Sequence, residues 1–109
     1  MNRNFDAPML SLDGKPYTDG ATLKTVVFSA IQAQVPHDEK MTVDQKMKLY
    51  VLAGKVAKGG VVEVTAEDLS LMKERVGLVY PPLTMGEAFR LLEQDHVAPA
   101  QSDATEASN

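Results

Sequence analysis

Prolines and glycines divide most of this chain into four segments whose apolar residues recur at helical spacing. Pro36, the pair Gly59-Gly60 and the pair Pro81-Pro82 stand at the borders between these segments. Proline lacks the N–H that a helix interior needs, and glycine commonly follows the end of a helix. We therefore expect four helices, none of them longer than about five turns. The first should begin near Ala21 and the last should end near Gln94.

Threonines followed by a polar residue three positions later mark the expected starts of the other three helices. In this capping spacing the threonine hydroxyl accepts a hydrogen bond from the third helical N–H, and the third side chain reaches back to the threonine N–H. Such reciprocal bonds satisfy backbone donors that the helix itself leaves unpaired. The pairs are Thr42 with Gln45, Thr65 with Asp68, and Thr84 with Glu87.

Each helical segment carries one apolar stripe that we expect to face a common core. We expect the lysines of the second segment to lie on its solvent side and the polar residues from Pro36 to Lys40 to form a loop. The expected core positions are Leu23, Val26, Val27, Ala30 and Ile31 in the first segment, Val43, Met47, Tyr50, Val51 and Val56 or Ala57 in the second, Leu69, Met72, Val76 and Val79 in the third, and Met85, Ala88, Phe89 and Leu92 in the fourth.

Two short parts of the chain are typical of strands. Residues 5–12 alternate weakly and lead into Asp13-Gly14, which favours a two-residue hairpin turn with the chain returning over residues 15–17. The β-branched run Val61 to Thr65 predicts a middle strand. Because a lone strand cannot satisfy its own backbone, we expect it to pair with the hairpin in a three-stranded sheet. The predicted fold class is α+β, a small sheet packed with about four helices.

The length of 109 residues suits one compact domain, which we expect over residues 1–95. Residues 99–109 contain no large apolar side chain, so we expect a disordered C-terminal tail over residues 96–109. The longest apolar stretch, near residues 26–30, is far shorter than the ~20 residues that cross a bilayer. No membrane contact is therefore expected, and the cytoplasm is the expected location.

Composition and spacing exclude several kinds of chemistry. The formal net charge of −4 is unfavourable for a surface that must neutralise many phosphates. The absence of cysteine excludes disulfides, thiolate metal sites and a cysteine nucleophile. His37 and His96 do not stand in a metal-binding or catalytic-triad spacing, and the glycines of residues 54–60 lack the spacing of a phosphate-binding loop. We predict that the chain is not an enzyme and binds neither a metal nor a cofactor.

More apolar residues are present than four core stripes require. Exposed members of this surplus would mark a protein interface, because monomers seldom leave large contiguous apolar areas in water. The lysines Lys46, Lys48, Lys55, Lys58 and Lys73, with Arg75, could alternatively form a local basic face for duplex DNA. The candidate partner-binding residues are Phe28, Leu49, Leu91, Lys48 and Lys55.

The chain resembles a group of small, uncharacterised bacteriophage proteins. The similarity rests on Asn4 to Pro16 with its Leu-Asp-Gly-Lys hairpin, on Thr22-Leu23-Lys24, on Lys48-Leu49-Tyr50, and on Val62 to Asp68. These motifs form turns and helix caps, and they specify no activity. The resemblance implies a phage origin and therefore the host cytoplasm as the compartment.

The function that we predict is non-enzymatic: the protein occupies a host or phage protein through a helix face. Two alternatives stay open at this point. One is a virion component, or a head or tail assembly factor or chaperone, and the other is a weak DNA-binding regulator. The identity of the partner and the oligomeric state cannot be read from the sequence.

Overall fold

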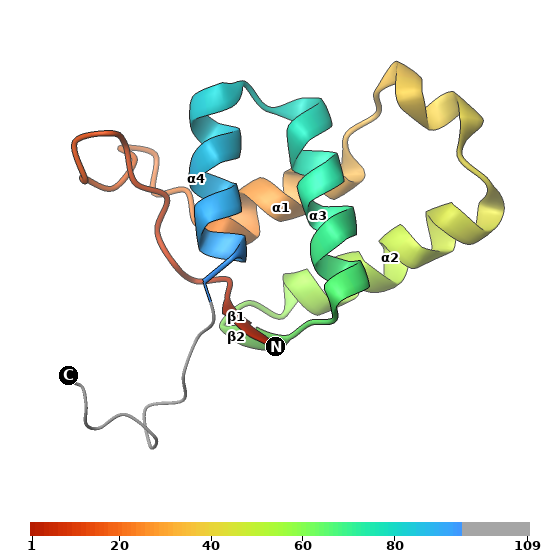
Figure 1. Ribbon diagram of the computed structural model, residues 1–109, viewed down its shortest axis with the longest axis horizontal. Coiled ribbons are helices and arrows are strands. Elements are labelled where there is room, and N and C mark those ends of the chain that lie inside the picture. Colours follow the sequence, from red (N-terminus) through yellow and green to blue (C-terminus); the bar gives the residue numbers. More distant parts are fainter. Residues whose placement is uncertain (95–109) are drawn as a thin grey trace.

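The computed structural model of the chain describes residues 1–94 (Figure 1). The tail predicted over residues 96–109 lies outside the described residues. Four α-helices and a two-stranded antiparallel sheet make the fold α+β. The elements, in chain order, are strand β1 (Asn2–Asn4), helix α1 (Leu23–Gln32), the 3-10 helix η1 (Pro36–Lys40), helix α2 (Val43–Ala57), strand β2 (Val61–Glu63), helix α3 (Ala66–Val79) and helix α4 (Pro82–Leu92).

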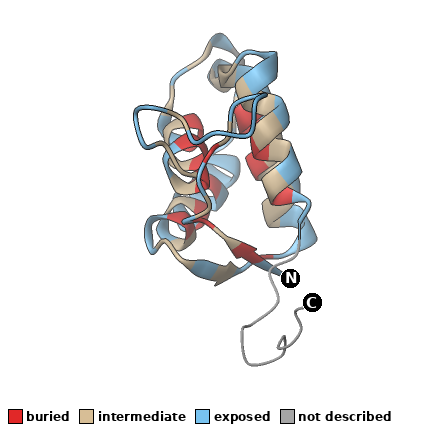
Figure 2. Cartoon of the chain, turned by 90° about the vertical axis from the view of Figure 1, so that its left-hand side faces the viewer, coloured by how far each residue is buried: buried red, intermediate tan, exposed pale blue. Residues whose placement is uncertain are grey.

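Helix α1 lies at the centre of the helical packing and contacts α2, α3 and α4. Figure 1 shows α3 and α4 side by side, with α1 crossing both of them and α2 extending away to one side. The faces that turn inward carry the buried residues, and the outward faces are exposed (Figure 2). The largest fully buried side chains are Phe5, Met9, Leu23, Leu52, Met72 and Leu92.

Reciprocal caps fix the starts of three helices. Two of the predicted capping pairs, Thr42 with Gln45 and Thr65 with Asp68, are confirmed. Helix α1 has a cap of the same kind, in which Thr22 and Thr25 bond to each other's backbone N–H. The stripe predicted for α1 is confirmed, since all five of its residues are buried.

The start predicted for the fourth helix is wrong. Helix α4 begins at Pro82, two residues before Thr84, and Pro81 is its N-cap. A proline at the first helical position supplies the required φ angle and lacks only an N–H that would have no partner there. Glu87, the predicted cap partner of Thr84, binds Arg90 and the N–H of Leu10 instead.

The predicted three-stranded sheet is also wrong. Strand β2 is present, but it pairs antiparallel with β1, with Asn2 opposite Glu63 and Asn4 opposite Val61. The turn at Asp13-Gly14 forms outside this sheet as a three-residue loop, closed by hydrogen bonds from Ser11 N–H to Lys15 O and from Gly14 N–H to Ser11 O. Gly14 has a φ of 84°, which glycine adopts without steric cost. The segment predicted as the polar loop 36–40 is η1.

Helix α2 is rotated relative to the prediction. The residues that it buries are Leu49, Leu52 and Val56. Four of the residues predicted to face the core, at positions 43, 47, 50 and 51, are exposed on the opposite side. Both sets recur at helical spacing, so periodicity alone could not choose between them. The buried set contains two leucines, which remove more apolar area from water than valines do.

Candidate functional site

An exposed apolar stripe runs along α2, and we call Val43, Met47, Tyr50 and Val51 the outer face. Their relative exposures are 75%, 53%, 73% and 57%. Single exposed apolar residues are normal on a protein surface, but contiguous ones mark interaction sites. These four residues lie on one side of one helix and therefore form a continuous apolar surface.

Two ion pairs link α2 to α3. Lys48 Nζ lies 3.1 Å from Glu67 Oε2, and Lys55 Nζ lies 2.8 Å from Asp68 Oδ2. Both lysines project toward the first turn of α3, where carboxylates are favoured by the helix dipole. Together with the buried residues of α2, these pairs keep the outer face directed toward solvent.

Asp68 links the cap of α3 to helix α2. Partial burial raises the pKa of its carboxyl, but the hydrogen bonds from the Lys55 ammonium and from the Thr65 N–H outweigh that effect, so the pKa lies below its ordinary value. The carboxylate is therefore charged near neutral pH and serves both as the cap of α3 and as the partner of Lys55.

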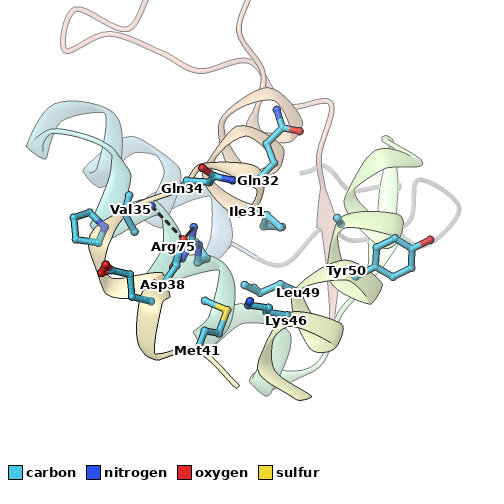
Figure 3. Close-up of a pocket in the computed structure, with 13 residues that line it drawn as sticks. Ile31, Gln32, Gln34, Val35, Asp38, Met41, Lys46, Leu49, Tyr50 and Arg75 are labelled. Atoms are coloured by element: carbon cyan, nitrogen blue, oxygen red, sulfur yellow. Dashed lines mark hydrogen bonds and ion pairs between the residues drawn. The ribbon is translucent and has the colours of Figure 1, made fainter. Parts of the chain in front are cut away.

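An open groove of about 680 Å³ lies beside the outer face, between the end of α1, η1 and α2. Tyr50 and Lys46 of α2 form one wall, and Arg75 and Asp38 lie at the opposite wall (Figure 3). Met41 and the edge of Leu49 lie between the two walls. The groove is mainly apolar, and it extends the surface of the outer face toward η1.

Arg75 is the structural centre of the far wall. Its side chain is only 3% exposed. Nε donates to Ala30 O at 3.1 Å, and Nη2 donates to Ala33 O at 2.6 Å and to Asp38 Oδ2 at 3.2 Å, while Nη1 binds Asp38 Oδ1. Asp38 Oδ2 also accepts the Val35 N–H. These bonds connect α3, the end of α1 and η1, so the guanidinium positions the groove wall.

Two of the charged groups that line the groove, Arg75 and Asp38, are paired with each other. Asp38 is committed to Arg75, and a catalytic acid or base would need to reach a substrate proton instead. Among the side chains that the structure describes, no group of three histidine or carboxylate residues is placed to hold a metal ion. Across residues 1–94, no helix has the length and apolar character that crossing a bilayer requires.

The candidate binding residues from the sequence do not come together as one surface. Leu49 belongs to the core, and Phe28 and Leu91 are partly buried and pack against it. Lys48 and Lys55 are on α2 but are paired with carboxylates of α3. An interface at these residues would need Phe28, Leu49 or Leu91 to be exposed, and none of the three is.

The basic residues are also dispersed or paired. Arg75 is buried, and Lys73 lies 2.9 Å from Glu93 and 5.8 Å from the centre of the Phe89 ring. A phosphate-binding surface needs several cations that face the same groove of the nucleic acid. The sequence pattern of lysines thus overstates the basic character of the surface.

A second apolar surface lies between the hairpin loop and the start of α4. Leu12 is 88% exposed and Leu83 is 65% exposed, and an open groove of about 600 Å³ separates these segments. One wall of this groove is a loop, whereas the outer face stands on a helix that packs against α1 and is paired with α3. We therefore regard the outer face as the better preorganised surface.

Sequence reasoning singled out all four residues of the outer face but assigned them to the core. The sequence also contains the competing stripe, Leu49, Leu52 and Val56, and its two leucines are the only local signal that favours burying it. In α2 the core takes one apolar stripe, and the other stays exposed to solvent.

Comparison of the chain with protein-family models, with curated proteins and with solved structures finds no match.

Proposed function

We propose that this protein is a non-enzymatic protein-binding domain that contacts its partner through the outer face of α2. The observation that carries the proposal is the exposure of Val43, Met47, Tyr50 and Val51 on one helix. Covering these side chains would remove apolar area from water, which is the main driving force of protein association. Tyrosine and methionine are also enriched at the centres of protein interfaces.

The way in which α2 is held supports this role. Buried Leu49, Leu52 and Val56 hold the second half of α2 against the core before any partner arrives, and two ion pairs link the helix to α3. A preorganised helix loses little conformational freedom on binding, so more of the contact energy becomes affinity. The groove beside Tyr50 gives the partner a concave edge next to the apolar stripe.

The partner that we propose is a protein of the host or of a phage particle, in line with the resemblance to small bacteriophage proteins. An assembly role in a virion would use the same surface. Nucleic acid is the weaker candidate, because Lys48, Lys55 and Lys73 are each paired with a carboxylate.

Paired affinity capture tests the proposal. The unchanged protein and the variant Met47→Glu/Tyr50→Glu are used as baits in a lysate of the cells that contain the chain. Both substitutions lie at exposed positions, so the fold is expected to persist, and circular dichroism checks this. The matched control is Leu12→Glu/Leu83→Glu, which adds the same charge on the other apolar surface.

The proposal requires one stoichiometric partner that the unchanged bait and the control retain and that the outer-face variant loses. Retention of every captured protein by the outer-face variant would overturn it. Co-purification of the protein with phage particles, abolished by the same variant, would identify the partner as a virion component. A gel shift of duplex DNA at low salt that persists in the variant would favour the DNA-binding alternative.

A further inference from the structure

The outer face of α2 has the spacing of a coiled-coil seam. Val43, Met47, Tyr50, Gly54 and Ala57 follow one another with alternating gaps of four and three residues. This alternation keeps the side chains on one narrow stripe that winds slowly around the helix, and it is the pattern through which two helices pack in a coiled coil. The seam lies opposite the buried residues of α2, and Val43, Met47, Tyr50, Gly54 and Ala57 are all exposed.

The seam is complementary to itself in shape. Met47 and Gly54 lie equally far from the midpoint between Tyr50 and Val51. A two-fold axis through that midpoint, at right angles to the helix, places Met47 of each copy opposite Gly54 of the other. A Cβ added at Gly54 would meet no atom within 4 Å, so the notch that this glycine leaves is open.

The seam is also complementary to itself in charge. Asp44 and Lys58 directly follow Val43 and Ala57, so both lie on the same flank of the seam. Lys58 has helical backbone angles and continues the course of α2. Rotation about the two-fold axis places this flank of one copy against the same flank of the other. Asp44 of one copy therefore lies next to Lys58 of the other, at both ends of the seam.

We propose that two copies of this chain associate through antiparallel packing of their α2 helices, centred on Tyr50 and Val51. This self-association uses the same surface as the proposed function but does not depend on it. One helix from each copy buries less area than the ~1,200 Å² of a standard stable interface, so the dimer forms at high concentration and dissociates on dilution. A heterologous partner of the outer face would then compete with the second copy.

Sedimentation of the purified protein tests the inference. From about 10 μM to about 1 mM the weight-average mass should rise from the monomer value toward twice that value. Asp44→Lys and Lys58→Asp should each weaken the association at least tenfold, because each places like charges opposite one another. The combined exchange Asp44→Lys/Lys58→Asp should restore it. Lys15→Asp, on the hairpin loop, is the control and should leave the association unchanged.

Gly54→Leu distinguishes the antiparallel packing of the seam from undirected apolar association. Leucine at an exposed helical position keeps the fold and adds apolar area. If the antiparallel seam is correct, the filled notch blocks Met47 and the association is lost. If the copies associate by undirected apolar contact, the same substitution strengthens it, and the inference is overturned.

A monomeric mass throughout the concentration range, or failure of the double charge exchange to restore the association, would also overturn the inference. Neither result bears on the proposed function, which is decided by the capture experiment. Conversely, failure of the unchanged bait to retain any partner would leave the concentration-dependent mass of the purified protein unaffected.

Discussion

Arg3 and Arg75 are buried, and each donates hydrogen bonds to carbonyl groups at the end of a helix. Arg3 Nε donates to Leu92 O, the last residue of α4, and Arg75 donates to Ala30 O and Ala33 O at the end of α1. The last carbonyls of a helix have no partner within it, and a cation there is favoured by the helix dipole. Each arginine therefore attaches a helix end to a distant part of the chain.

Arg75→Met should lower the free energy of unfolding by about 3–5 kcal/mol, because Asp38 loses its cationic partner and the carbonyls of Ala30 and Ala33 lose their donor. Lys73→Met is the matched control. It breaks an exposed pair with Glu93 and should cost less than about 1 kcal/mol. Urea denaturation of both variants gives the comparison, and losses of similar size would contradict the structural role of Arg75.

Glu87 links the stability of the protein to pH. The hydrogen bonds from Arg90 lower the pKa of its carboxyl; partial burial opposes them, and the Leu10 N–H lowers the pKa further. The folded state thus releases this proton more readily than the unfolded state does. The resulting stabilisation is fully present above about pH 4.5, the ordinary pKa of the group, and is lost as the pH falls through the lower folded-state pKa.

Glu87→Gln should therefore reduce the free energy of unfolding by about 1 kcal/mol at pH 7, and the difference from the unchanged protein should vanish at pH 2. Denaturant titrations at the two pH values measure it. Glu67→Gln, on an exposed pair with Lys48, should change stability by only a few tenths of a kcal/mol at pH 7. A deficit in Glu87→Gln that stays constant down to pH 2 would argue against this link.

The role of Arg75 could be predicted only in part from the sequence. The residue stands three positions after Met72 and next to Val76, so it lies on the predicted core face of the third helix. A charged residue on such a face indicates a buried partner. Its partners, Asp38 and the carbonyls at the end of α1, are far away along the chain, and only tertiary packing brings them together.

At the scale of elements, the helix positions were predictable because caps, prolines and glycines act locally. Thr42 and Thr65 cap the helices that they were expected to cap. The pairing of β2 was not predictable, since its partner β1 has the polar sequence Asn-Arg-Asn, which lacks the β-branched and aromatic residues typical of strands. Long-range contacts place this short segment, and they leave no local signal.

The rotation of α2 was also not predictable from local sequence. Two apolar stripes with helical spacing compete for the core, and the choice depends on what α1 and α3 offer. Leu49, Leu52 and Val56 fit against the core, and the Lys48 and Lys55 ion pairs are available only in that rotation.

Neighbouring residues of α2 test its rotation. Leu52 is 1% exposed and Val51 is 57% exposed. Leu52→Ala should cost about 2–5 kcal/mol because it leaves a cavity in the core. Val51→Ala should change stability by no more than about 0.5 kcal/mol. Thermal or urea unfolding measures both variants, and a larger loss for Val51→Ala would mean that the helix is rotated as the sequence alone suggested.

At the scale of the whole molecule, α1 packs against the other three helices and leaves α2 with one side uncovered. The core is complete without Val43, Met47, Tyr50 and Val51. A surface of this kind has no role in stability, which is the physical basis for assigning it to a partner. The sequence predicted the surplus of apolar residues, but the packing of the whole chain decides which residues form the surplus.

The labelling rate of a single introduced thiol tests the central claim most directly, because the chain contains no cysteine of its own. Tyr50→Cys and Leu52→Cys place the thiol on opposite sides of α2. In the native protein the thiol at position 50 should react with a maleimide about as fast as in denaturant, and the thiol at position 52 should react at least tenfold more slowly. Protection at position 50 and rapid labelling at position 52 would contradict the outward orientation of the outer face.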